Sequence, residues 1–190
     1  SPDGKWFTLC FIGNKHDPYS DIGIVSTQGG EITNLTNSGY ASGSPRWVMD
    51  GNAILFTSER YGMRNHASWG SMEDVFLCFT NQDAYDKYRL SKEDYELLKE
   101  LEKEQDKLKK NDKKDEKKDD KKKEEVKLIN IELDGIQDRI VRLTPASSRL
   151  GDAIIDKKGK LQCNFMPGAH ALVIGATGSG KTTTFINPMI

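Results

Sequence analysis

The sequence has little of several residue types that would point to a particular chemistry. Its 190 residues include three cysteines, three histidines and six prolines, and 28 Lys and Arg residues nearly balance 29 Asp and Glu residues. Cys10, Cys78 and Cys163 are odd in number, far apart and without C-x-x-C spacing, which argues against a disulfide framework or a zinc site. A net charge of −1 argues against a general affinity for polyanions.

Long hydrophobic runs are also missing. No apolar stretch is long enough to span a bilayer, and no signal peptide is visible. The chain begins at Ser1, inside the first copy of a repeated unit and without an initiating Met, so the sequence leaves the compartment open.

No nucleophile motif surrounds the candidate serines and histidines, which are therefore assigned to loops and the surface. These residues are Ser20, Ser26, Ser42, Ser44, His16 and His66.

One block carries most of the excess of charged residues. From Ser91 to Glu125 most residues are Lys, Asp or Glu, and such a run buries too little apolar surface to offset the entropy of ordering. We expect a solvated insertion whose first part is helical, because Ser91 and Asp94 have the spacing of a capping box. Lys alternates with Asp and Glu, which favours a spacer over a basic arm for nucleic acid. A thin apolar stripe follows the cap: Tyr95, Leu97, Leu98, Leu101 and Leu108.

On either side of the insertion, the chain repeats a β pattern. Asp-Gly followed by an apolar strand occurs twice, about 47 residues apart, close to the spacing of four-stranded propeller blades. Gly accepts the positive φ of the tight turn, and 156–160 provides a third turn of this kind. The matched segments are 1–11 with 48–58, 21–25 with 74–78, and 29–36 with 137–144. A simple antiparallel sandwich stays open as the alternative.

The repeat also predicts where several single residues lie. Trp6 and Trp47 lie beside the repeated turns and are expected to pack in blade cores, whereas Trp69, in a polar loop, is a candidate for contact with a ligand or partner. Cys10 and Cys78 lie in predicted strands and are expected to be small buried hydrophobes. The acidic residues Asp50, Glu73 and Asp74 are too scattered for a metal site and are assigned to turns.

The repeated segments resemble the N-terminal β-propeller of bacterial tricorn-type serine proteases. The likeness covers about residues 1–161 and includes Ser-Pro-Asp-Gly-Lys-Trp at the start, Ser44-Pro45-Arg46-Trp47, and Leu55 to Arg60. In that family a similar charged insertion lies within the propeller. The resemblance implies a propeller that guides peptides toward a separate protease domain, and no residue of this chain corresponds to the family's catalytic serine or histidine.

A second motif lies near the C-terminal end. Residues 175–182 match the phosphate-binding loop pattern G-x-x-x-x-G-K-[ST], after an apolar run at 171–174 and before 183–186, which would continue as a helix. The alternative is a plain glycine-rich turn. Lys181 would reach the terminal phosphates of ATP, and the Thr182 hydroxyl would coordinate Mg²⁺. The expected nucleotide-binding residues are Gly175, Gly178, Ser179, Gly180, Lys181 and Thr182.

The stretch 168–188 resembles the first strand and loop of the coupling-protein ATPases of conjugation and type IV secretion, which are hexameric, membrane-anchored DNA motors. The remaining groups of such a site are not encoded after Ile190, and phosphoryl transfer needs several groups acting together. We therefore expect weak or undetectable ATP binding and no hydrolysis by this chain. DNA would be a partner only if this resemblance holds, and the two families imply the bacterial periplasm, cell envelope or inner membrane.

Together these patterns predict a mainly β chain that joins a partial propeller to a truncated strand, phosphate-loop and helix fragment. The expected organisation is 1–90 propeller blades, 91–125 charged insertion, 126–161 return to a blade, and 162–190 nucleotide-binding fragment. An incomplete propeller leaves open sheet edges, and the 171–174 strand can be recruited onto one of them. Three functions stay open: a non-catalytic propeller segment of a tricorn-like protease with peptides or the protease domain as partners, part of a DNA-transfer ATPase, and an interaction scaffold.

Overall fold

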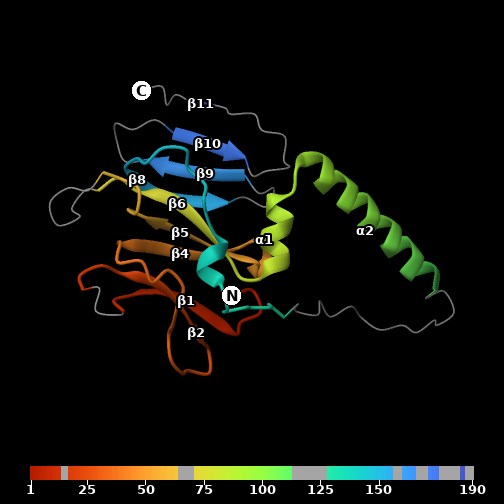
Figure 1. Cartoon of the computed structure of the whole chain (residues 1–190), viewed down its shortest axis with the longest axis horizontal. Coiled ribbons are helices and arrows are strands. Elements are labelled where there is room, and N and C mark those ends of the chain that lie inside the picture. Colours follow the sequence, from red (N-terminus) through yellow and green to blue (C-terminus); the bar gives the residue numbers. More distant parts are fainter. Residues whose placement is uncertain are drawn as a thin grey trace.

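The structure, a computed structural model, describes residues 1–13, 17–63, 71–112, 128–155, 160–165, 171–175 and 185–186. Three antiparallel sheets dominate it, which confirms the mainly β fold class (Figure 1). The first sheet holds β1 (Trp6–Phe11), β2 (Asp21–Ser26) and β3 (Thr33–Asn34). The second holds β4 (Ser42–Val48), β5 (Ala53–Ser58), β6 (Asp74–Phe79) and β7 (Ile140–Arg142). The third holds β8 (Leu150–Ile155), β9 (Lys160–Phe165), β10 (Ala171–Gly175) and β11 (Phe185–Ile186).

The predicted repeat is present in the strand pairing. In the first sheet Phe11 pairs with Asp21, and in the second Ser58 pairs with Asp74, at the same place in each ladder. Thus β1, β2 and β3 correspond to β5, β6 and β7, as the matched segments predicted. In all three sheets each strand pairs with the next one along the chain, which is the meander of a propeller blade.

The second sheet is buried on both faces. Side chains alternate along a strand, so neighbours on β5 point to opposite sides. Ile54 and Phe56 pack with Ile22, Ile24 and other residues of the first sheet. Ala53 and Leu55 pack on the other side with residues of the third sheet: Leu150, Ala153, Leu161 and Cys163. Full burial of such a side chain stabilises the fold by about 1.5–3 kcal/mol, so these two layers are the main source of stability.

The burial of the tryptophans and cysteines depends on where they lie relative to these two layers. Trp6 and Trp47 pack against the layer between the first two sheets, as predicted. Cys78 is buried, and loss of hydration raises the pKa of its thiol to about 12. Cys163 is buried as well, and desolvation raises its pKa to about 11. The prediction was wrong for Cys10, which is exposed on β1, the edge strand of the first sheet.

A left-handed turn joins β4 to β5. Its residues Met49, Asp50 and Gly51 have φ values of 53°, 54° and 87°, and the equivalent Gly4 before β1 has a φ of 70°. A Cβ at Gly51 would lie 2.3 Å from Cδ1 of Ile129, whereas nothing lies within 4 Å of one at Gly4. The Asp-Gly turns predicted from the sequence are therefore confirmed, and glycine is required more strictly at position 51 than at position 4.

In the described residues between β6 and β7, two α-helices precede a short 3-10 helix, η3 (Ile136–Arg139). In α1 (Gln82–Arg89), the Asn81 side chain caps the first turn by accepting from Ala84 N at 2.8 Å, and Tyr85 and Tyr88 pack on Phe79. This helix is not predicted from the sequence. The second helix, α2 (Lys92–Asp112), begins as predicted, since Asp94 N donates to Ser91 Oγ at 3.1 Å. Figure 1 shows α2 projecting away from the sheets; residues 113–127 lie outside the described part of the chain.

The C-terminal strands extend the third sheet. The strand predicted at 171–174 is β10, and it pairs antiparallel with β9, Val173 opposite Gln162, so its expected recruitment onto an open edge is confirmed. The helix expected at 183–186 is corrected by the structure, because Phe185 and Ile186 form β11. They pair with Leu172 and Ala171, and an aromatic and a β-branched residue suit such an edge position.

Candidate functional site

A buried aspartate begins the second strand of the first sheet. The Asp21 carboxylate accepts from Thr36 Oγ1 at 2.7 Å and Ser38 N at 3.0 Å, and from Asn34 Nδ2 at 2.9 Å. Thr36 Oγ1 in turn accepts from Ile22 N at 3.0 Å. These bonds tie the segment after β3 back to β2.

The second sheet repeats this arrangement. The Asp74 carboxylate is fully buried and accepts from Thr144 Oγ1, Arg142 Nη2 and Ser147 Oγ, at 2.7, 2.8 and 2.7 Å. Thr144 Oγ1 accepts from Val75 N at 3.3 Å, which matches the bond of Thr36. We call Asp21–Thr36 and Asp74–Thr144 the Asp–Thr clamps.

The clamps correct one assignment made from the sequence. Asp74 was placed in a turn, but it is the first residue of β6 and a buried acceptor. The signal was present, because both matched strands begin with Asp and both matched third segments end in Leu-Thr. Residues 161–190 contain no Asp, so the sequence does not allow an equivalent clamp on β9 or β10.

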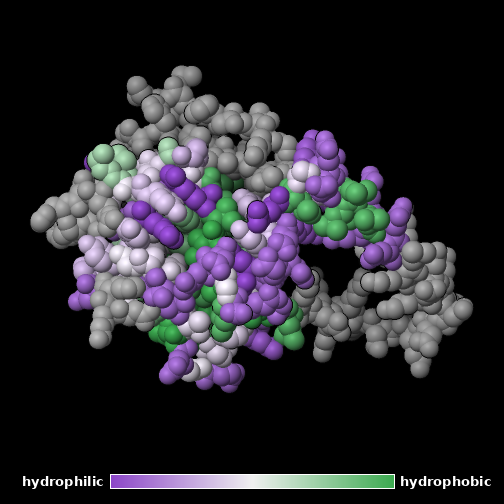
Figure 2. All heavy atoms as spheres, in the orientation of Figure 1, coloured by the Kyte–Doolittle hydropathy of each residue, from purple (hydrophilic) through white to green (hydrophobic). Residues whose placement is uncertain are grey.

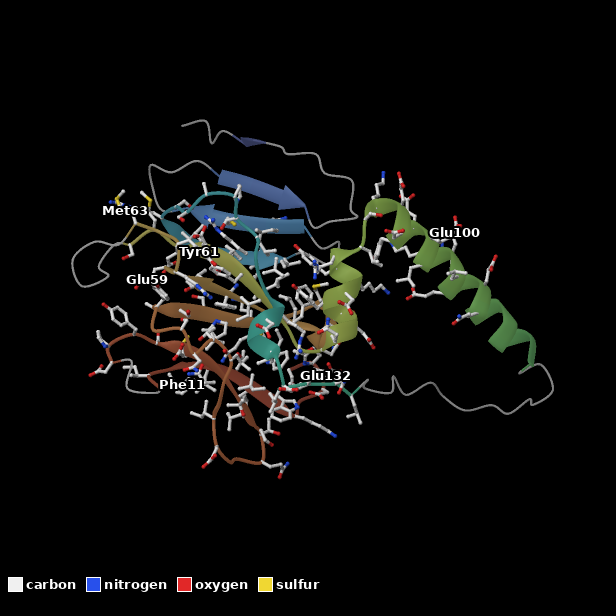
Figure 3. The ribbon with its side chains drawn as sticks, in the orientation of Figure 1. Phe11, Glu59, Tyr61, Met63, Glu100 and Glu132 are labelled. Atoms are coloured by element: carbon white, nitrogen blue, oxygen red, sulfur yellow. The ribbon has the colours of Figure 1, made fainter. Side chains whose placement is uncertain are left out.

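The clamp in the second sheet supports an exposed aromatic and cationic surface. After β5 ends, the Tyr61 ring lies 5.6 Å from the guanidinium carbon of Arg60 and 5.3 Å from that of Arg142. Tyr61 also contacts Phe76, with ring centroids 6.0 Å apart. The exposed fractions are 57% for Tyr61 and 71% for Met63. Figure 3 shows Tyr61, Met63 and Glu59 at one end of the molecule, opposite α1 and α2. We call this surface, residues 60–63 with Arg142, the β5–β6 rim.

Two carboxylates lie beneath the rim. Glu59 is 2% exposed, and Ala41 N donates to its Oε1 at 3.4 Å. Glu73 joins the same region through backbone bonds to Ser148. Desolvation raises the pKa of Glu73 and the nearby charge of Glu59 raises it further, while a hydrogen bond from Thr57 acts in the opposite direction.

A small pocket opens where the segment after β3 meets the second sheet. Its polar part consists of hydroxyl side chains: Thr36, Ser38, Ser42 and Ser58. Phe56 and Phe76 provide the apolar part, with their rings stacked 5.4 Å apart, and Arg60 provides a positive charge. The pocket has room for about one water molecule, so it is too small to accept a ligand or a side chain.

The candidate serines and histidines do not form a nucleophile and base among the described residues. All three histidines lie outside the described part of the chain. The candidate serines Ser20 and Ser42 serve the fold: Ser20 Oγ donates to Ser42 O at 2.8 Å, and Ser42 Oγ lies 3.1 Å from Ser58 Oγ. Within the described ranges, no group of three or more His, Cys, Asp or Glu residues could hold a metal ion. No described helix combines the length and apolar character needed to cross a membrane.

The predicted nucleotide-binding residues are for the most part not described. Gly175 is the last residue of β10. Gly178, Ser179, Gly180, Lys181 and Thr182 lie outside the described residues, as does Trp69. The structure therefore does not test the predicted phosphate loop or a ligand contact by Trp69.

The repeated antiparallel sheets, with one sheet packed between the other two, define a β-propeller segment. Comparisons with known proteins agree with this class. The fold is similar to that in the crystal structure of the tricorn protease, with a TM-score of 0.54 and 8% identity over 95% of this chain and 17% of that one. At this identity the likeness concerns the fold alone.

A shorter match comes from a curated sequence. Over 57 residues, 30% of the chain, it is 42% identical to a Bacillus subtilis (strain 168) protein described as an uncharacterized peptidase, YuxL, and covers 8% of that protein. The chain thus spans a small part of either relative. No protein-family model matches the sequence.

Proposed function

We propose that the chain is a non-catalytic propeller segment of a tricorn-like serine protease, which contacts peptides on their way to a separate protease domain. The main support is the blade repeat, whose fold is similar to part of the tricorn protease. The 42% identity to a peptidase over 57 residues supports the same assignment from sequence.

In this proposal the β5–β6 rim is the surface that peptides contact. Aromatic and Arg side chains provide large contact areas in protein interfaces, and Tyr61 offers an exposed ring between two guanidinium groups. Met63 adds a flexible apolar side chain that adapts to different partners.

Fluorescence anisotropy with dye-labelled unfolded peptides tests this proposal. We expect the purified chain to bind them, and the Tyr61→Ala/Met63→Ala variant to bind about tenfold more weakly or worse. Leu128→Ala is the matched control, because Leu128 is also exposed (63%) but does not belong to the rim. Absence of binding, or equal loss of affinity in both variants, would refute the peptide-contacting role of the rim.

The phosphate-loop motif supports a second, subordinate proposal of weak Mg-ATP binding. A strand, β10, directly precedes the motif, as the motif requires. That strand lies in an antiparallel ladder, whereas phosphate loops normally follow a strand of a parallel sheet, and we therefore infer low affinity. A DNA partner and an envelope location would accompany this proposal only within a larger ATPase.

A further inference from the structure

The helix α2 carries an apolar face that the body of the molecule does not cover. Leu97 and Leu101 are four residues apart, so they share one side of the helix, and they are 58% and 49% exposed. Leu98 is partly buried, and Leu108 continues the stripe in sequence. Figure 2 shows hydrophobic side chains gathered over α2, where Figure 1 shows this helix projecting from the sheets.

The base of α2 is held in place. Lys87 on α1 and Glu102 on α2 form an ion pair of 2.8 Å between Nζ and Oε1, and Ser91 caps the first turn. Lys99 lies over the Tyr95 ring, 4.5 Å from its centre. The Lys87–Glu102 pair sets the side of α2 that faces α1, and Leu97 and Leu101 stay exposed on the rest of the helix.

The charges of α2 are distributed unevenly along its length. Residues 92–105 contain six acidic and three basic residues, whereas residues 106–112 contain three basic and two acidic residues. The N-terminal part is therefore net negative and the C-terminal part net positive. The same polarity exists in every copy of the chain, so two copies are complementary in one relative direction and repulsive in the other.

We propose that α2 is a self-association surface that pairs antiparallel with α2 of a second copy of this chain. With the two helices overlapping along their whole length, position 97 of one copy would lie near position 108 of the other and Leu101 would lie near the middle of the pair, which removes Leu97 and Leu101 from water. In this direction the net negative part of one helix, residues 92–105, lies beside the net positive part of the other, residues 106–112. A parallel pair would bring like charges together along the whole helix, which disfavours it.

Sedimentation velocity of the full chain over a wide concentration range tests the proposal. We expect a concentration-dependent dimer, and a dimer dissociation constant about a hundredfold larger in Leu97→Glu/Leu101→Glu. Leu128→Glu is the matched control, since it changes a leucine of similar exposure away from α2 and should leave the dimer unchanged. Circular dichroism and thermal melting establish that each variant is folded. A monomer at every concentration, or equal effects of the two changes, would overturn the proposal.

Charge reversal provides a second test that does not depend on the leucines. Lys107→Glu/Lys109→Glu/Lys110→Glu makes all of α2 acidic, and Glu93→Lys/Glu96→Lys/Glu100→Lys makes its first half basic. Each variant alone should be monomeric, while an equimolar mixture should form a heterodimer. Failure of the mixture to associate would contradict the role assigned to the charges.

Spin-label distances test the direction of pairing. Cysteines replace Glu93 or Lys103 in a Cys10→Ser background, because Cys10 is the exposed native thiol. An antiparallel pair places labels at 93 about 30 Å apart and labels at 103 about 10 Å apart. Equally short distances at both positions would show a parallel pair and overturn the proposed geometry.

Discussion

Removal of the carboxylate in the second Asp–Thr clamp should be among the most damaging single changes in this chain. Asp74 is fully buried and accepts hydrogen bonds from Thr144, Arg142 and Ser147. Asp74→Ala leaves these donors without their common acceptor and detaches the segment after β7 from β6. The clamp and the rim share Arg142, so the change also removes the support of the Tyr61 surface.

The size of the effect follows from the exposure of each partner. Hydrogen bonds to a charged group contribute about 1.5–3 kcal/mol each, and breaking a buried charge pair costs about 3–5 kcal/mol. Because Arg142 is 32% exposed, water can solvate its guanidinium once Asp74 is removed. The cost of losing this ion pair is therefore smaller than for a fully buried pair. We expect a loss of about 3 kcal/mol in the free energy of unfolding, which lowers Tm by about 6–12 °C in a chain of this size.

Urea unfolding followed by tryptophan fluorescence measures this loss, because Trp6 and Trp47 report on the core layer. Asp152→Ala is the matched control: its 2.9 Å ion pair with Arg46 is exposed on both sides and should contribute less than about 1 kcal/mol. Asp21→Ala should resemble Asp74→Ala, because the clamp is repeated. If Asp74→Ala costs no more than Asp152→Ala, the clamp does not hold the blade together.

Three further predictions follow from other parts of the chain. Gly4→Ala should lower the free energy of unfolding by roughly 1–2 kcal/mol, the cost of left-handed strain. Gly51→Ala should lower it further, because a Cβ at position 51 also meets Ile129. Equal losses in urea unfolding would contradict a clash at position 51. Because burial raises the folded-state pKa of Glu73 above its ordinary 4.5, stability should fall as pH rises from 4.5 through that higher value. Glu73→Gln should therefore stabilise the protein at pH 7 but not below pH 4.5. If thermal melts show the same difference in Tm between variant and parent at every pH, ionisation of Glu73 is not the cause. Calorimetric titration with Mg-ATP should show weak or undetectable binding, and micromolar affinity abolished by Lys181→Ala would disprove the low affinity inferred for the phosphate loop.

The repeat made much of the fold predictable. Asp-Gly turns and alternating apolar residues are local signals, and they located the strands that became β1, β2, β5 and β6. The capping residues Ser91 and Asp94 located the start of α2 in the same way. Packing of Trp6 and Trp47 followed from their place beside the turns.

Long-range contacts were harder to foresee. The Asp74 clamp joins residues about seventy positions apart, across two helices, and a single sequence does not show that Asp74 and Thr144 meet. The β5–β6 rim cannot be predicted from the sequence for the same reason, because Arg142 contacts Tyr61 only once β7 has paired with β6. Phe185 and Ile186 form a strand because β10 offers an unpaired edge, and this tertiary effect overrides their expected helical continuation.

The proposed function is tested most directly by mixing the purified chain with labelled unfolded peptides and following binding and peptide length in the same sample. We predict that anisotropy rises with protein concentration, that the rise depends on Tyr61 and Met63, and that chromatography recovers the peptides intact. Peptide cleavage that is lost on changing one of the chain's own side chains would contradict a non-catalytic propeller segment, and so would the absence of any peptide binding.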